Sequence, residues 1–263
     1  MLKHPVSRAL HLDRLGVYME AKNIIRDAVA HVTLLRQNAA GDPQLAQAIS
    51  DIKHLQARRF AGTYFDLLHS ERYQRAAQFF LEELYSEKDY SLRDAQFGRI
   101  AGALQRIFPE QVVQTAVSLA QLHRLTEELD LAMARHWMTS AGSGEVARYI
   151  AAWRTVDRRP DRDMQLATVM SVGHELDRLT RTPGLRMMLK MMRGPAHLSG
   201  LGSLQKFLES GFDTFAAMGR TADGAAFFLD TVKGRESGLI ERLFDADAVA
   251  CETEITQILG QPR

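Results

Sequence analysis

The chain has 263 residues, of which 46% are hydrophobic, and 33 Lys and Arg residues against 32 Asp and Glu residues leave a net charge of +1. So many apolar residues exclude a disordered chain and predict a large core, and the balanced charge argues against nucleic acid as a partner. Cys251 is the single cysteine, so no disulfide forms within the chain.

Two further features concern location. No stretch of the chain is apolar over the ~18 residues that a membrane-spanning helix needs. Residues 1–15 lack the continuous apolar run of a secretory signal. Together with the lone cysteine, which fits a reducing compartment, these features predict a soluble, cytoplasmic protein without a transmembrane segment.

Apolar residues recur with helical spacing through nearly the whole chain, whereas the alternating pattern of strands is rare. At the start of the second predicted helix, Asp42 is a suitable cap and Pro43 a suitable first residue. The spacing predicts helices over residues 12–37, 43–69, 71–85, 92–108, 110–137, 145–156, 163–181, 185–193, 201–218, 222–232, 237–244 and 246–259.

These segments predict an all-α fold, a compact multi-helix bundle of about ten helices with no β-sheet. We expect residues 1–263 to form a single all-helical domain, with the helices over 71–85, 92–108 and 110–137 at its core. The Gly- and Ser-rich stretch 139–144 is the best candidate for a boundary between two halves.

The predicted helix over residues 110–137 carries three polar residues on its apolar face. On a helical wheel of about 100° per residue, Ala116 and Met133 belong to this face. His123, Glu127 and Asp130, spaced i, i+4 and i+7, lie in the middle of it. Polar residues placed against the pattern in this way indicate either a buried ion pair or a functional site.

Arg93 is misplaced in the same way in the preceding helix. It lies on the apolar side near Phe97, and in the first turn, where the helix dipole disfavours a cation. A buried charge costs on the order of several kcal/mol unless it is paired. We therefore expect Arg93 to pair with Glu127 or Asp130, with His123 as a hydrogen-bonded core residue.

The same cluster has a second interpretation as a metal or acid–base site. Carboxylates and histidines on facing helices build di-metal sites in helical bundles, although the usual Glu-x-x-His pair is missing here. The ligands would be His123, Glu127 and Asp130, with Glu83 or Asp94 as further candidates. No GxSxG or HExxH motif is present, so the sequence assigns no catalytic residue and no cofactor.

The segment LRMMLKMMR over residues 185–193 is rich in methionine. Its spacing puts Arg186, Lys190 and Arg193 on one stripe and four methionines on the opposite side. Methionine surfaces adapt to varied ligands or partner helices, but a core helix with a solvated basic edge is the simpler interpretation and the one that we favour. The glycine-rich segment 194–202 that follows is expected to be the most flexible stretch of the chain.

Two stretches resemble segments of a bacterial family of all-helical proteins without assigned function. They are FFLEELYSEKDYSLRDAQFGRI over residues 79–100 and MRGPAHLSGLGSLQKFLESGFDTFAAM over residues 192–218. The resemblance implies a bacterial protein that forms one family unit, which weakens a two-domain reading. It transfers no catalytic or binding residue.

Our leading functional expectation is a non-enzymatic helical protein that binds a small hydrophobic ligand or a protein partner such as a helix. The apolar excess, the methionine-rich helix and the adjacent glycines favour it. The alternative is a metal-dependent enzyme, with a di-metal carboxylate site as one form, whose site lies on the inner face of the helix over residues 110–137.

Overall fold

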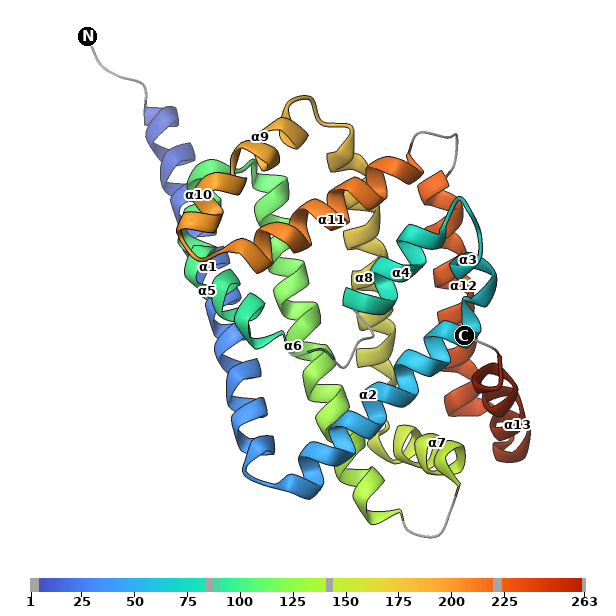
Figure 1. The fold of residues 1–263 in the computed structure, drawn as a ribbon. Coiled ribbons are helices and arrows are strands. Elements are labelled where there is room, and N and C mark those ends of the chain that lie inside the picture. Colours follow the sequence, from blue (N-terminus) through green and yellow to red (C-terminus); the bar gives the residue numbers. More distant parts are fainter. Residues whose placement is uncertain (1–4, 84–87, 89, 141–143, 220–223, 262–263) are drawn as a thin grey trace.

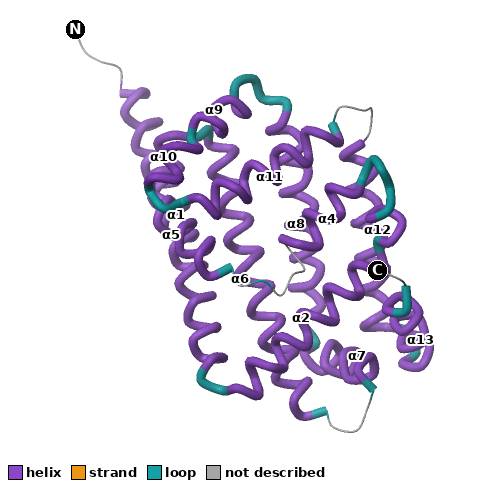
Figure 2. Tube along the Cα trace, viewed as in Figure 1, coloured by secondary structure: helices purple, strands orange, loops and turns teal. Residues whose placement is uncertain are grey.

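The computed structural model describes residues 5–83, 88, 90–140, 144–219 and 224–261, and every regular element in these ranges is a helix (Figures 1 and 2). The expected all-α fold is thereby confirmed. The elements are α1 (Pro5–Ala40), α2 (Pro43–Thr63), α3 (Phe65–Leu68), α4 (Gln74–Glu83), α5 (Ser91–Ile107), α6 (Glu110–Thr139), α7 (Glu145–Val156), α8 (Arg159–Thr180), α9 (Leu185–Met191), α10 (Arg193–Leu198), α11 (Gly202–Met218), α12 (Gly224–Asp245) and α13 (Ala248–Leu259).

Helix α6 is the axis of the bundle, and α1, α2, α7 and α8 pack directly on it (Figure 1). Its 30 residues give a length of about 45 Å. Leu129, Met133 and Ala134 are completely buried. Because neighbours cover several sides of this helix, it can present polar side chains to the interior as well as apolar ones.

Two aromatic-rich cores flank the middle of the bundle. One joins α2, α4, α8, α11 and α12 through Phe60, Phe80, Met170, Phe215 and Phe228. The other joins α2, α6, α7, α12 and α13, and it includes Trp137, Tyr149, Trp153, Leu243 and Ile255. Helices far apart in the sequence are therefore held together by large buried side chains.

Two glycines allow unusually close packing of helices. A Cβ on Gly173 of α8 would lie 2.5 Å from Cδ2 of Leu229 on α12. A Cβ on Gly62 of α2 would overlap the backbone carbonyl of Ile258 on α13. Any larger residue would force these helices apart, so both glycines serve packing.

Helix α12 is one continuous helix where the sequence predicts two, over 222–232 and 237–244. Gly234, which lies between the two predicted segments, is exposed inside α12. A glycine inside a helix costs about 1 kcal/mol. Burial of Val232 and Leu239 on either side outweighs this cost.

The segment 194–202 also differs from expectation, because most of it forms α10. Gly200, at a φ of 66°, takes the left-handed conformation after α10. The predicted helix over 43–69 is interrupted at Tyr64 and continues as α3.

Some expected features fall on residues outside the described ranges. These are positions 84–85 at the end of one predicted helix, positions 222–223 at the start of another, and positions 141–143 of the candidate boundary. The single-domain organisation stays a prediction, although α7 and α8, which follow the candidate boundary, both pack on α6. Within the described ranges, no helix combines the length and the apolar character needed to cross a bilayer.

Candidate functional site

A cavity of about 230 Å³ lies along α6 and is lined by side chains from the surrounding helices. Its lining runs from Val112 near the start of α6 to Asp130 in the second half. These two positions are about 27 Å apart along a helix. A cavity of this volume that extends over this length is narrow rather than globular.

The two ends of the cavity differ in chemistry. Toward the start of α6 the wall is apolar, and we call this part the apolar end. It is lined by Phe97, Ile100, Phe108, Val112, Leu179, Leu185, Leu189, Leu208 and Phe212. Toward the second half of α6 the wall is charged and consists of two groups of side chains, which differ in how far they are exposed.

The first group, the outer cluster, comprises Arg36, Lys53, Asp94, His123 and Glu127 from α1, α2, α5 and α6. Arg36 Nη1 donates to Asp94 Oδ2 at 2.8 Å, and Arg36 Nη2 donates to Glu127 Oε1 at 2.9 Å. Lys53 Nζ donates to the same Glu127 oxygen at 2.8 Å. The side chains of Arg36 and Lys53 are 27% and 19% exposed, so solvent reaches the edge of this cluster.

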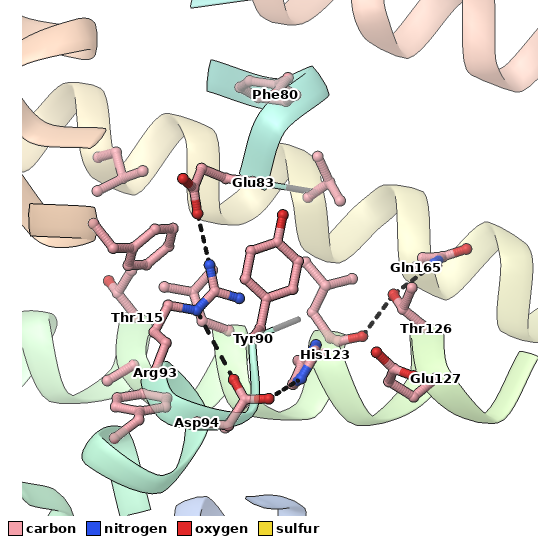
Figure 3. A pocket seen from close by; sticks show the side chains of 18 of the residues that line it. Phe80, Glu83, Tyr90, Arg93, Asp94, Thr115, His123, Thr126, Glu127 and Gln165 are labelled. Carbon is pink, nitrogen blue, oxygen red and sulfur yellow. Dashed lines mark hydrogen bonds and ion pairs between the residues drawn. The ribbon is translucent and has the colours of Figure 1, made fainter. Parts of the chain in front are cut away.

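His123 joins the outer cluster through one ring nitrogen. Its Nε2 lies 2.8 Å from Asp94 Oδ2 (Figure 3) and 3.3 Å from Arg36 Nη2. Because an arginine nitrogen only donates and a carboxylate oxygen accepts, the shorter contact fixes Nε2 as the donor to Asp94. His123 is therefore hydrogen-bonded in the interior, but to Asp94 rather than to a residue of its own helix.

The two carboxylates of the outer cluster are held ionised. Burial opposes ionisation of Asp94, but the hydrogen bond and charge of His123 and the charge of Arg36 outweigh burial and lower its pKa below the usual range. Burial likewise opposes ionisation of Glu127, and Lys53 and Arg36 overcome it, so the pKa of Glu127 is also lowered.

Arg93 pairs with a different acid from the one expected. Its Nη1 donates to Glu83 Oε2 of α4 at 2.7 Å, and its Nε lies 3.9 Å from Asp94 Oδ1 (Figure 3). The guanidinium also stacks on Tyr90 and on Phe207 of α11, at 4.0 Å and 4.6 Å from the ring centroids. Arg93 is thus directed to α4 and α11, because adjacent helical residues point about 100° apart and Asp94 takes the direction toward α6.

The second group, the inner cluster, is more deeply buried and comprises Gln56, Arg59, Asp130, Arg162 and Glu236. Arg59 Nη1 of α2 donates to Glu236 Oε1 of α12 at 2.5 Å. Gln56 Nε2 donates to Asp130 Oδ1 at 3.2 Å. Arg162 of α8 donates from Nη1 to Gln165 Oε1 at 3.2 Å, and its guanidinium carbon lies 4.0 Å from the centroid of the Trp153 ring.

The pKa of Asp130 shifts in the opposite direction from that of Glu127, although the two residues lie only one turn apart on α6. Burial raises the pKa of Asp130, since Lys53 is 4.0 Å away and the charges of Lys53 and Arg162 compensate only partly. Burial also raises the pKa of Tyr149, which lies among the charges of Arg59, Arg162, Glu236 and Asp130. The inner cluster therefore favours a protonated Asp130.

The four side chains singled out in the sequence do not form one compact site. His123 and Glu127 are linked in the outer cluster through Asp94 and Arg36, Asp130 belongs to the inner cluster, and Arg93 pairs with Glu83. All four line the same cavity. The cavity, rather than the ion pair, is what they share.

A metal site at these residues finds little support in their geometry. In the part of the chain that the structure describes, no group of three or more His, Cys, Asp or Glu side chains is arranged to hold a metal ion. Oxygens of Glu83, Asp94 and Glu127 already face arginine or lysine nitrogens within 3 Å. The metal-dependent alternative stays a prediction.

Helix α9 closes the apolar end of the cavity, but not through its methionines. Leu185 and Leu189 are buried and line the cavity, whereas Met187 and Met191 are 61% and 72% exposed. The basic stripe is held at the surface, where Arg193 pairs with Glu209 at 2.5 Å. The leucines of this helix therefore contact the cavity.

Sequence reasoning missed four charged residues that line the cavity, Lys53, Arg59, Arg162 and Glu236, and it missed Arg36, which pairs with the cavity residues Asp94 and Glu127. For two of them the sequence holds a signal. Arg59 follows Leu55 at i+4 on the apolar stripe of α2, and Glu236 lies between Val232 and Ile240 on that of α12. Arg36 and Lys53 carry no such signal, because only the packing of α1 and α2 on α6 brings them to Glu127.

Comparison with known proteins places the chain in a family. No curated protein and no solved structure matches it. Residues 35–250 match the model of the domain of unknown function DUF8198. This range includes every residue of the outer and inner clusters and the whole apolar end. The chain therefore belongs to the DUF8198 family, which has no assigned function.

Proposed function

We propose that the protein binds a small ligand with a narrow apolar body and one polar end in the cavity along α6. A single observation carries this proposal. The cavity of about 230 Å³ has aliphatic and aromatic walls at one end and charged, hydrogen-bonding walls at the other. Ligand sites in proteins are typically such apolar cavities with a few placed polar groups.

The size of the cavity supports a ligand rather than water as its occupant. A single water needs roughly 10–15 Å³ of the same kind of volume. The cavity is many times larger, and water at its apolar end would find few hydrogen-bond partners. An apolar ligand there would recover contacts that the surrounding leucine and phenylalanine side chains otherwise lack.

A partner helix, the other occupant that we considered, fits the cavity poorly. An α-helix with its side chains is about 10–12 Å across. The cavity spreads 230 Å³ along much of α6 and is far narrower than that. The proposal therefore rests on a small ligand inside the bundle and not on a helix docked against it.

The test is a binding screen with a variant that fills the cavity. Val169 of α8 lines the cavity, whereas Ala167 of the same helix faces solvent. We expect Val169→Phe to block the cavity and Ala167→Phe to leave it open. Thermal-shift assays would measure the rise in Tm caused by dodecanol and other single-chain amphiphiles with wild-type protein and both variants.

The outcomes separate clearly. Saturable shifts in wild-type protein and in Ala167→Phe, lost in Val169→Phe, would support the proposal. Shifts of equal size in all three proteins would place the ligand outside the cavity and overturn it. No shift with any amphiphile, while elemental analysis of protein purified without chelator finds a stoichiometric metal, would favour the metal-dependent alternative instead.

A further inference from the structure

We propose that the polar end of the ligand is a carboxylate, bound in the inner cluster against Arg162 and Trp153, with an alkyl chain directed along α8 to the apolar end. This inference rests on the function proposed above. It names the class of ligand, a single-chain carboxylic acid, and the direction in which it lies.

Trp153 supplies the first observation. Trp153 is only 7% exposed and lines the cavity. Among the described residues, no acceptor is hydrogen-bonded to its indole Nε1. An indole N–H can only donate, and a buried donor destabilises the fold unless an acceptor is supplied. A ligand that ends in an acceptor would meet this requirement.

Arg162 supplies the second observation. It is 6% exposed, lines the same cavity and lies with its guanidinium 4.0 Å from the Trp153 ring centroid. Two donor side chains, Arg162 of the inner cluster and Trp153 beside it, are therefore adjacent, and one of them is charged. An arginine guanidinium matches the geometry of a carboxylate, with two parallel N–H groups for two oxygens.

The charges around Arg162 also favour an anion. Glu236 is paired with Arg59, and Glu127 with both Lys53 and Arg36. Asp130 lies near Arg162, whose charge acts on it, and burial favours the protonated form of this acid. A protonated Asp130 would repel a carboxylate bound beside Arg162 less than an ionised one would.

A cationic end group fits the same wall less well. Every carboxylate of the cavity wall apart from Asp130 already has a basic partner: Glu83 with Arg93, Asp94 with Arg36, Glu127 with Lys53 and Glu236 with Arg59. An amine would have to displace one of these side chains. It would also leave the indole N–H of Trp153 facing another donor.

The direction of the chain follows from α8 itself. After Arg162, the cavity-lining residues of this helix are Gln165, Leu166, Val169, Leu176 and Leu179. The first two lie within one turn of Arg162, and the others continue as an apolar stripe to the end that α9 closes. A chain that begins at Arg162 would run along this stripe over about 25 Å.

The test compares ligands that differ only at the head. Dodecanoate, dodecanol and dodecylamine would be titrated into wild-type protein by isothermal titration calorimetry at neutral pH, below their micelle concentrations. We expect dodecanoate to bind roughly tenfold more tightly than dodecanol, because a charged hydrogen bond replaces a neutral one. We expect dodecylamine to bind most weakly.

Matched variants test where the polar end of the ligand binds. Arg162→Gln should reduce the affinity for dodecanoate to that for dodecanol, and Trp153→Phe should reduce it in part. Arg159→Gln removes a charge from the same helix, but Arg159 pairs at the surface with Asp245 at 2.6 Å, so binding should not change. Circular dichroism would check that each variant is folded.

Each result decides the inference. Equal affinity for dodecanoate and dodecanol, or a preference for dodecylamine, would overturn the carboxylate head while leaving the proposed function intact. No binding of any of the three would overturn the proposed function itself. If Arg162→Gln does not fold, the wild-type comparison and Trp153→Phe still decide.

Discussion

The outer and inner clusters lie one helical turn apart on α6, and they shift the pKa values of their acids in opposite directions. In the outer cluster, Arg36 and Lys53 reach Glu127 from α1 and α2 and lower its pKa. In the inner cluster, Asp130 accepts from the neutral Gln56, and burial raises its pKa. The comparison teaches that the neighbouring helices, and not the position on α6, set the charge of each acid.

The largest effect is expected deep in the inner cluster, at Glu236. Glu236→Gln removes the carboxylate that lies 2.5 Å from Arg59 and 2.9 Å from the Tyr64 hydroxyl. Breaking a buried ion pair from one side costs about 3–5 kcal/mol. Urea unfolding would measure this loss, with Glu241→Gln on the exposed face of α12 as the control. A loss no larger than that of the control would refute the assignment of a buried pair.

A smaller loss is expected in the outer cluster. Glu127→Gln replaces the charged acceptor of two hydrogen bonds, from Arg36 and Lys53, with a neutral amide. Because both cations are partly exposed and can turn to solvent, we expect a loss of about 2 kcal/mol in the free energy of unfolding. The adjacent Glu128 contacts Arg124, His31 and Arg158, whose side chains are 49%, 38% and 35% exposed, so Glu128→Gln should cost less than about 1 kcal/mol. Equal losses in the two variants would contradict this account.

The pH dependence of stability has opposite signs in the two clusters. Asp94 and Glu127 have lowered pKa values, so the stability that they contribute is present above their unfolded pKa and is lost as pH falls through the folded values. Asp130 has a raised pKa, so its contribution is present at low pH and is lost as pH rises through the folded value.

Carboxyl-carbon NMR on ¹³C-labelled protein would follow these groups individually, with Glu127→Gln and Asp130→Asn used to assign their signals. We expect Glu127 to titrate below the usual range of a glutamate and Asp130 above that of an aspartate. Titration of both acids within the usual range would remove the difference between the clusters.

The smallest effect is expected at Asp130. In Asp130→Asn the side-chain oxygen can still accept from Gln56, and no charge has to be buried. We expect the free energy of unfolding at neutral pH to change by less than about 1 kcal/mol. The measurement is the same urea titration, and a loss as large as that of Glu127→Gln would mean that Asp130 is ionised.

The sequence predicted the fold class because helical spacing is a local property. The same wheel placed Glu127 and Asp130 on the buried face of α6, and both are buried. It could not assign their partners. Arg36 lies 91 positions from Glu127, and only the folded arrangement of α1 brings them together.

At two further positions, the difference between the sequence-based prediction and the structure has a local physical origin. A glycine such as Gly234 is typical of the end of a helix, but the buried residues on both sides of it keep α12 continuous. Arg93 was assigned to the acids of α6 because spacing along a helix does not say in which direction a side chain extends. The aromatic rings of Tyr90 and Phe207 direct it to Glu83.

A crystal structure of the protein grown with dodecanoate would test the central claim most directly. The account predicts the carboxylate within hydrogen-bonding distance of Arg162 and of the Trp153 indole nitrogen, and the alkyl chain in the cavity between α6 and α8, directed toward Leu185 and Leu189. A cavity without the fatty acid, at concentrations that saturate binding in solution, or a fatty acid on the outer surface of the bundle, would contradict it.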